Sequence, residues 1–232
     1  MFDYCRNEFN LSPDMMLFSQ LNEDTKRRYF CLKFSRACFM NLPKTVDEFR
    51  RLHRKKYWYN LKRSQGLFEK HYGALEFKIV ADKAELMRYL PEVFKLFRKR
   101  WEGRFTSCNW KTKSGEIAYT KALLDLAKQN RAFLAVLTGL NDTLLSYGYC
   151  LCEGSTVYFY QHSTDDSSEY RRFSLGKIFI ALLLENLVKQ GIFRKFDFMV
   201  GNQPYKLEWA SGCEDVYKLF PKNGDLPVIF FQ

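Results

Sequence analysis

The sequence predicts an α/β (α+β) fold with a mixed, mostly antiparallel sheet, one parallel strand pair at its centre and helices on both faces. From residue 75 onward, the apolar pattern gives the order β-α-α-β-β-β-α-β-α-β-β. Three consecutive strands form a meander, and the helix after them is apolar over too wide an arc to face water. The helix follows the last strand of the meander and leads into a further strand. If that strand lies beside the last meander strand, the two run parallel.

Size and composition limit the class of protein. The chain has 232 residues, of which 47% are hydrophobic, with 22 Phe, 14 Tyr and 4 Trp. This composition excludes a disordered chain, and a chain of this length buries about 70–75% of its unfolded surface without disulfide or metal. The longest apolar run, 178–184, is far shorter than the about 20 residues of a spanning helix. Residues 1–6 lack the layout of a secretion signal, so we expect neither a membrane span nor a secretion signal.

The seven cysteines are odd in number and irregularly spaced. Cys150 and Cys152 lie within an apolar alternating stretch, separated by one residue, whereas paired metal-binding cysteines are usually separated by two to four. We therefore expect small core or sheet-face residues and no metal site. Free thiols are typical of a reducing compartment, which predicts a cytoplasmic protein.

The N-terminal third is divided into two segments. Short strands are expected over 29–34 and 37–42, before Pro43, and a helix over 45–70 that ends near Gly73. The predicted organisation is an N-terminal segment (1–42), a basic helix (43–74) and a main domain (75–232).

The predicted basic helix carries over half of the excess charge. The whole chain has a formal net charge of +11, and Lys44–Tyr72 alone has nine basic and three acidic side chains. Three interpretations are open. Clustered cations indicate a nucleic-acid or anionic-surface site; they also occur on a solvated helix face; or they form an electropositive rim that attracts an anionic substrate or cofactor.

The main domain begins with a strand and two helices. A strand is expected from period-two alternation, and the next helix from an aspartate cap followed by apolar residues at helical spacing. The expected elements are a strand over 75–80, a helix from Asp82 to Trp101 that kinks or restarts at Pro91, a polar loop over 103–114 and a helix after Ser114.

A meander and a third helix follow. Gly191 comes directly after the expected end of that helix at Gln190, as a C-terminal cap should. The expected elements are strands over 132–138, 144–152 and 156–162, a helix over 174–190, a strand over 195–200, an amphipathic turn over 205–211 and strands over 216–220 and 228–231.

The joint before the third helix is a candidate phosphate site. It reads Arg171-Arg172-Phe173-Ser174-Leu175-Gly176-Lys177. A helix N-terminus presents unpaired N–H groups that bind anions, Ser174 and Gly176 allow close approach to the backbone, and three basic side chains add cationic donors. The alternative is an ordinary serine-capped helix with exposed basic residues.

The element order and this joint resemble the GNAT acyltransferase superfamily, in which an R/Q-x-x-G-x-G/A turn binds the pyrophosphate of acetyl-CoA. Residues 171–176 fit this turn with Ser174 in place of the first glycine. Over residues 42–211 the chain is most similar to the CelD/BcsL-like branch, which is related to the Fem-type aminoacyl transferases. On this comparison residues 1–42 are the remnant of a first half. The matching residues are Leu42-Pro43, the basic helix, Arg100-Trp101, 174–176, Asp197, Gly201, Tyr205, Lys206 and Trp209.

The resemblance implies where an acyl-CoA binds. The two central parallel strands, 156–162 and 195–200, splay apart and the pantetheine lies in the gap. A backbone N–H near Tyr160 to His162 then points at the thioester oxygen as an oxyanion donor. The cofactor-binding residues implied are Gln161, His162, Arg171, Arg172, Phe173, Ser174, Leu175, Gly176 and Lys177.

Three side chains are catalytic candidates. An imidazole can accept the proton of the amine, which assigns His162, although a strand-end histidine also serves to hydrogen-bond a loop. By resemblance Tyr205 protonates the departing thiolate; otherwise it packs. Lys206 binds substrate or is a surface cation. We expect Asp197 to organise the turn that follows it.

The sequence thus predicts a bacterial, cytoplasmic N-acyltransferase. It moves an acyl group from an acyl-CoA, in the first instance acetyl-CoA, to an amine of a small-molecule or envelope- or polysaccharide-related acceptor, without a metal. An aminoacyl donor is a second option by analogy with the Fem-type relatives. The alternatives are a catalytically silent scaffold of the same fold and a nucleic-acid-binding module that uses residues 44–72.

Overall fold

The computed structural model describes residues 17–19, 29–101, 112–201 and 203–221. Most of the loop predicted over 103–114 and the strand predicted over 228–231 lie outside these residues. The chain divides into two compact units, one of residues 42–196 and the other of residues 1–41 and 197–232. Strand β7 (Lys195–Val200) crosses the division.

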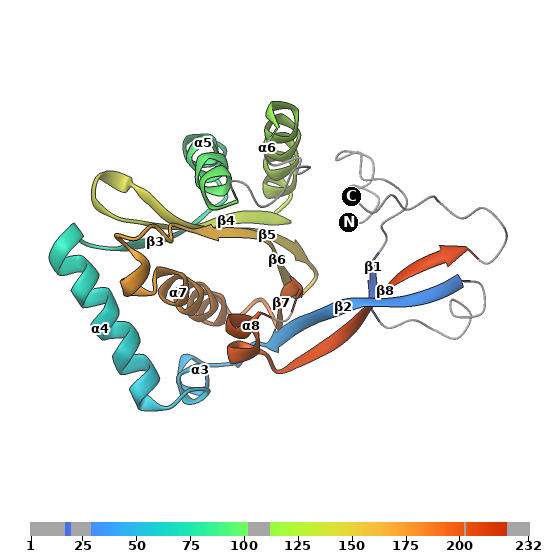
Figure 1. The fold of residues 1–232 in the computed structure, drawn as a ribbon, viewed down its shortest axis with the longest axis horizontal. Coiled ribbons are helices and arrows are strands. Elements are labelled where there is room, and N and C mark those ends of the chain that lie inside the picture. Colours follow the sequence, from blue (N-terminus) through green and yellow to red (C-terminus); the bar gives the residue numbers. More distant parts are fainter. Residues whose placement is uncertain (1–16, 20–28, 102–111, 202, 222–232) are drawn as a thin grey trace. The chain divides into compact units, whose positions relative to one another are not determined.

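The larger unit contains the meander and most of the helices (Figure 1). Its elements are α3 (Val46–Arg51), α4 (Lys55–Tyr72), β3 (Glu76–Val80), α5 (Lys83–Arg100), α6 (Lys113–Lys128), β4 (Ala132–Thr138), the short 3₁₀ turn η2 (Leu140–Asp142), β5 (Leu144–Glu153), β6 (Thr156–Thr164), the 3₁₀ turn η3 (Arg171–Phe173), α7 (Leu175–Gln190) and the start of β7.

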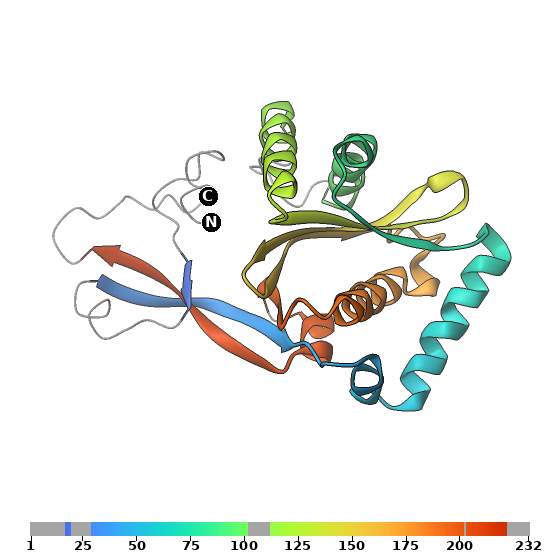
Figure 2. The same ribbon diagram turned by 180° about the vertical axis from the view of Figure 1, so that it is seen from behind.

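The sheet of this unit confirms the predicted class. Strands β3, β4, β5 and β6 pair in that order, each antiparallel to the next. The Ser155 carbonyl, just before β6, accepts from the Arg194 and Lys195 amides at 2.7 and 3.2 Å. Because β6 and β7 thus begin at the same edge, they run parallel. Helices α5 and α6 cover one face and α7 the other (Figures 1 and 2). Splaying of the parallel pair stays a prediction.

Burial on both faces explains the sequence of the central strands. Every residue of β4 is buried, and every residue of β5 except Glu153. Gly148 of β5 lies under the Phe159 ring, where an added Cβ would come within 2.4 Å of a ring carbon. Only glycine therefore allows β5 and β6 to pair with Phe159 in this position.

Helix α5 begins at the predicted cap and ends near the predicted residue, but it is one helix rather than two. The Asp82 carboxylate accepts from the amides of Ala84 and Glu85 at 2.8 and 3.2 Å, which caps the helix. The helix runs through Pro91 without a restart. Buried side chains on both sides of the proline, Leu90 and Val93, anchor the helix on the sheet and offset the lost backbone hydrogen bond.

The basic segment forms two helices, so the prediction of one helix over 45–70 is wrong. Helix α3 ends at Arg51, and Arg54 is extended before α4 begins. The Trp58 indole N–H donates to the Arg50 carbonyl at 2.7 Å, and the Trp58 ring packs on Phe49. A side chain thereby satisfies a carbonyl in the last turn of α3, which stabilises the break.

The smaller unit is built on a long two-stranded ribbon. Its elements are β1 (Leu17–Ser19), β2 (Tyr29–Asn41), the end of β7, α8 (Pro204–Trp209) and β8 (Gly212–Pro221). Strand β8 is antiparallel to both β1 and β2. The two strands predicted over 29–42 are one strand, with an irregular register between Lys33 and Ser35. An inserted residue of this kind interrupts the apolar alternation, which explains the error.

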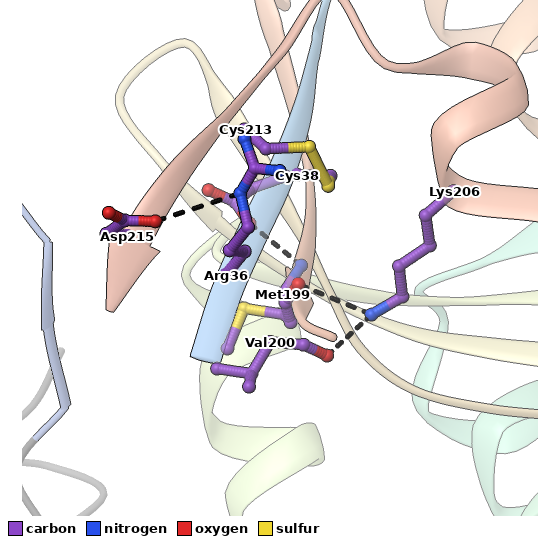
Figure 3. The surroundings of a disulfide bond; sticks show 8 residues. Arg36, Cys38, Met199, Val200, Lys206, Cys213 and Asp215 are labelled. Carbon is purple, nitrogen blue, oxygen red and sulfur yellow. Dashed lines mark hydrogen bonds and ion pairs between the residues drawn. A yellow bond between two sulfur atoms is a disulfide. The ribbon is translucent and has the colours of Figure 1, made fainter. Parts of the chain in front are cut away.

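A disulfide joins Cys38 to Cys213 across directly opposed positions of β2 and β8 (Figure 3). The expectation of free thiols is therefore wrong for these two residues. It is confirmed for Cys150 and Cys152, which are free and buried. Burial raises the pKa of the Cys152 thiol to about 12, so it stays protonated. A disulfide is typical of oxidising environments, so the argument from free thiols for a cytoplasmic location is lost.

Within the described ranges, no helix combines the length and the apolar character that crossing a bilayer requires.

Candidate functional site

The joint between β6 and α7 takes the backbone shape of a glycine-containing turn. Ser174, directly after η3, has φ 53° and ψ 39°, in the left-handed region. This conformation costs a residue with a Cβ about 1–2 kcal/mol, whereas glycine has no such steric penalty. Ser174 therefore replaces the first glycine of the predicted turn without changing the path of the chain.

The first turn of α7 has unsatisfied backbone donors. The Ser174 carbonyl accepts from the amides of Lys177 and Ile178 at 2.9 and 3.2 Å. The amides of Leu175 and Gly176 donate to no described residue, and the Ser174 side chain does not cap the helix. The serine-capped alternative is therefore wrong. The first turn also lacks an acidic residue, so its partial positive charge is not neutralised there.

Gly176 brings the helix onto the end of β6. A Cβ at this position would lie 3.2 Å from the Thr164 hydroxyl oxygen, tighter than an ordinary contact. The Thr164 hydroxyl is itself within 2.8 Å of the Ser146 hydroxyl. The turn and the last residue of β6 are thus in contact, two residues beyond His162.

Helix α4 holds the turn from the other side. The Ser64 hydroxyl donates to the Phe173 carbonyl at 2.6 Å. The Phe173 ring is 3% exposed and meets the rings of Phe68 and Tyr72 edge to face, with centroids 5.4 and 5.6 Å apart. Phe173 is one of the residues predicted to bind cofactor. Its ring is buried and serves to pack α4 against the turn, so only its backbone lies at the turn. Sequence reasoning missed Ser64, which has no signal beyond its place in a helix.

The predicted cationic residues are exposed around this turn. Arg171, Arg172 and Lys177 all face solvent. The Arg172 guanidinium lies over the Phe173 ring, 4.6 Å from its centroid. Neither arginine forms an ion pair with any residue in the described part of the chain. Their charge is therefore available to an anion at the turn.

Strand β6 contains a bulge at the predicted oxyanion donor. Tyr149 faces Gln161 and Cys150 faces Phe159, so Tyr160 is the extra residue. Residues three apart in a regular strand lie on opposite faces, but the bulge puts Phe159 and His162 on the same face, where their rings stack at 4.5 Å. Tyr160 lies on the other face, 3.4 Å from the Tyr119 hydroxyl of α6. Bulges interrupt the hydrogen-bond ladder and are frequent beside active sites.

Lys206 lies in the smaller unit and is not a surface cation. It is 4% exposed, and its ammonium donates to the carbonyls of Val200 and Met199 at 2.7 and 3.3 Å (Figure 3). Burial lowers the pKa of Lys206 to about 8, although the charge of Asp197 opposes the shift. The Asp197 carboxylate accepts from the Met199 amide at 2.8 Å, which confirms that it organises the turn.

Met199 has a left-handed φ of 61°, and Gly201 follows with φ 109°. The Gly201 amide donates to the Arg36 carbonyl at 2.7 Å. Tyr205 is half-buried and contacts Phe198 edge to face at 6.5 Å. The polar groups at the end of β7 thus form hydrogen bonds within the protein.

Comparison with known protein families shows to which family this chain belongs. A family model described as an acetyltransferase (GNAT) domain matches residues 54–207, more than half of the chain. The chain belongs to the GNAT acyltransferase family. The match contains α4, the Arg171–Lys177 turn and most of α8.

Solved structures show the same fold for this GNAT chain. A conserved protein of unknown function from Bacteroides thetaiotaomicron is 13% identical, with 88% of this chain and 68% of that one covered and a TM-score of 0.57. L-PGS from Bacillus licheniformis is also 13% identical (98% and 73% covered, TM-score 0.56). FemX is 11% identical (86% and 63% covered, TM-score 0.54). No protein of curated function matches.

The predicted site residues of the GNAT chain fall into two groups. Gln161, His162 and the turn 171–177 belong to the larger unit, where the turn contacts Thr164 at the end of the bulged strand. Tyr205 and Lys206 belong to the smaller unit. The first group combines uncapped amides, two arginines without a described ion-pair partner and an irregular strand. In the second, the Lys206 ammonium is hydrogen-bonded within the protein.

Proposed function

We propose that this GNAT-family protein transfers an acyl group from acyl-CoA, in the first instance acetyl-CoA, to an amine. The observation that carries the proposal is the uncapped first turn of α7. The amides of Leu175 and Gly176 donate to no described residue, and Arg171 and Arg172 beside them have no ion-pair partner in the described part of the chain. Such a turn fits a diphosphate, the group that an acyl-CoA brings.

The chain's own groups would then divide the reaction between them. The turn binds the diphosphate, which directs the thioester toward β6. The bulge at Tyr160 interrupts the pairing of β6 with β5, and a backbone N–H near Tyr160 to His162 serves as the oxyanion donor. The amine nitrogen forms a bond to the thioester carbonyl carbon and the carbon–sulfur bond breaks. The amine proton passes to His162, and the departing thiolate takes up a proton, a step that the resemblance assigns to Tyr205.

Lys206 receives a structural part in this proposal. Its ammonium already donates to two carbonyls at the end of β7. We therefore assign it to holding the segment that precedes Tyr205, as a positioning residue in place of the substrate-binding role predicted from sequence.

The proposed branch of the family and the proposed acceptor rest on the sequence resemblance. We propose a bacterial, CelD/BcsL-like enzyme with a small-molecule or envelope- or polysaccharide-related amine as acceptor and no metal. A cytoplasmic location stays a prediction. By analogy with the Fem-type transferases of the resemblance, an aminoacyl donor stays a second option. Two hypotheses compete with an enzyme of this kind: a catalytically silent scaffold and a nucleic-acid-binding module.

Isothermal titration of the full chain with acetyl-CoA tests the proposal. We expect saturable binding to wild type and at least about tenfold weaker binding to Arg171→Ala/Arg172→Ala, because hydrogen bonds to charged groups contribute about 1.5–3 kcal/mol. Arg51→Ala/Arg54→Ala is the matched control, since these arginines are also exposed and do not line the cavity at the turn. Absence of binding to acetyl-CoA and to longer acyl-CoAs would refute the proposal.

Two further measurements separate an active enzyme from the competing hypotheses. A silent scaffold predicts acetyl-CoA binding without turnover on any amine tried. A nucleic-acid module predicts duplex binding that weakens steeply with salt and is lost when Arg54, Lys55 and Lys56 are neutralised.

A further inference from the structure

We propose that the cavity between α4 and the first turn of α7 receives the 3′-phosphorylated ribose of acyl-CoA, with Arg63 as the phosphate contact. The inference rests on the proposed function, because it extends the ligand from the diphosphate at the turn to the next charged group. It assigns α4 a binding role and selects the electropositive rim among the interpretations of the basic segment.

The cavity has the size and the lining of a small-ligand site. Its volume is about 370 Å³, within the range of about 300–1,000 Å³ that is usual for such sites. Its polar lining comes from α4 and from the turn: Tyr57, Asn60, Arg63, Ser64, Ser174 and Lys177.

The cavity is continuous with the turn that is proposed to bind the diphosphate. Ser174 and Lys177 line it, and the uncapped amides of Leu175 and Gly176 lie between these two residues in the sequence. In coenzyme A the ribose with its 3′-phosphate follows the diphosphate on the side away from the thioester. A ligand anchored at the amides therefore has its third phosphate close to this cavity.

Charge distinguishes this cavity from its neighbour along α4. A second cavity, of about 500 Å³, shares Leu61 with it, but its two basic side chains are matched by Glu69 and Glu185. There Arg50 already forms an ion pair with Glu185. The cavity at the turn has two cations, Arg63 and Lys177, and no acidic side chain. In this cavity, unlike its neighbour, no acidic lining residue faces the Arg63 guanidinium, so the charge of Arg63 is available to a phosphate.

Arg63 is free to bind and is presented by a fixed helix. It is exposed and has no ion-pair partner in the parts of the chain that the structure covers. The next residue, Ser64, is hydrogen-bonded to the Phe173 carbonyl at 2.6 Å, and the Phe68 ring packs on the Phe173 ring. The distance between α4 and the turn is thus set before a ligand arrives, which lowers the entropic cost of binding.

The test compares coenzyme A with 3′-dephospho-coenzyme A by isothermal titration of the full chain. Wild type is expected to bind coenzyme A at least about tenfold more tightly, as one charge-assisted phosphate contact predicts. Arg63→Ala should lose most of this preference by weakening the binding of coenzyme A alone, with 3′-dephospho-coenzyme A unchanged within about twofold. Arg63→Gln, which keeps a polar helix-forming side chain, should behave in the same way. Arg51→Ala, an exposed arginine that lines neither cavity, should keep the preference.

Failure of this inference and failure of the proposed function give different results. Equal binding of the two ligands to wild type would overturn the 3′-phosphate assignment and leave the acyl-CoA proposal intact. Equal weakening of both ligands in Arg63→Ala and Arg63→Gln would also overturn it, because Arg63 would then act elsewhere on the ligand. No binding of either ligand to wild type would overturn both proposals.

Discussion

The ends of strands β6 and β7 differ in whether the polar groups there have partners within the protein. At the end of β7, the carbonyls of Met199 and Val200 accept from the buried Lys206 ammonium, and the Asp197 carboxylate accepts from the Met199 amide. After β6, the turn into α7 leaves the amides of two residues without a described acceptor and two arginines without a described counterion. Buried or constrained polar groups are normally satisfied. The end of β7 is therefore held by the protein itself, and the open turn after β6 supports the proposal that a ligand binds there.

The largest expected effect comes from the residue that fixes the open turn. Phe173→Ala removes a ring that is 3% exposed and packs against aromatic side chains of α4. Deletion of a buried aromatic side chain costs about 3–5 kcal/mol in the free energy of unfolding. Urea denaturation measures this, and acetyl-CoA binding should weaken in the variant as the turn loosens. Phe173→Leu is the control, with a loss of stability well below that of alanine. If Phe173→Ala kept its stability but lost acetyl-CoA binding, the ring would contact the ligand directly.

The closed strand end predicts an intermediate effect. Lys206→Met leaves two carbonyls at the end of β7 without their donor, which costs about 1–3 kcal/mol in the free energy of unfolding. Lys70→Met, at an exposed position in the last turn of α4, should change it by less than about 0.5 kcal/mol. Normal stability together with lost turnover in Lys206→Met would instead assign the ammonium to the substrate.

Lys206 also makes the free energy of unfolding depend on pH. The pKa of Lys206 is about 8 in the folded protein, below the 10.5 of a solvated lysine. Between these two pH values the unfolded chain binds more protons than the folded one, so the free energy of unfolding rises with pH. The stability difference between wild type and Lys206→Met should therefore change from pH 8 to pH 10, with wild type gaining relative to the variant. A constant difference over this range would show that the ammonium is not desolvated.

The smallest effect concerns Ser174. Ser174→Gly relieves a left-handed backbone but adds freedom to the unfolded chain, so the free energy of unfolding should change by no more than about 1 kcal/mol. Because the hydroxyl does not cap α7, acetyl-CoA affinity should stay within about twofold. Ser174→Val, β-branched at a positive φ, should lower stability. A large loss of affinity in the glycine variant would show that the hydroxyl binds the ligand.

Local patterns in the sequence were sufficient for most of the fold. The meander follows from alternation and turn residues, and α7 from its apolar arc and Gly191, which adopts φ 69° at the C-cap. The same signals predicted the Arg171–Gly176 turn, because its chemistry lies in consecutive residues. The break between α3 and α4 was missed, since helical periodicity does not report that Trp58 satisfies the Arg50 carbonyl.

Features that depend on contacts between distant parts of the chain could not be predicted from the sequence. Cys38 and Cys213 are separated by 175 residues, and their bond depends on the register of β2 against β8. Lys206 is an ordinary lysine in sequence and becomes buried only when α8 packs against the end of β7. The part that α4 plays at the turn rests on the Ser64 contact with Phe173, 109 residues away.

Backbone amide NMR during addition of coenzyme A tests the central claim most directly. If the uncapped turn binds the phosphates, the amide protons of Leu175 and Gly176 should shift strongly downfield, because they gain charged acceptors. The Gly191 amide, which donates to the Leu187 carbonyl at the other end of α7, should not move. Saturable binding of coenzyme A with unchanged Leu175 and Gly176 resonances would contradict the account.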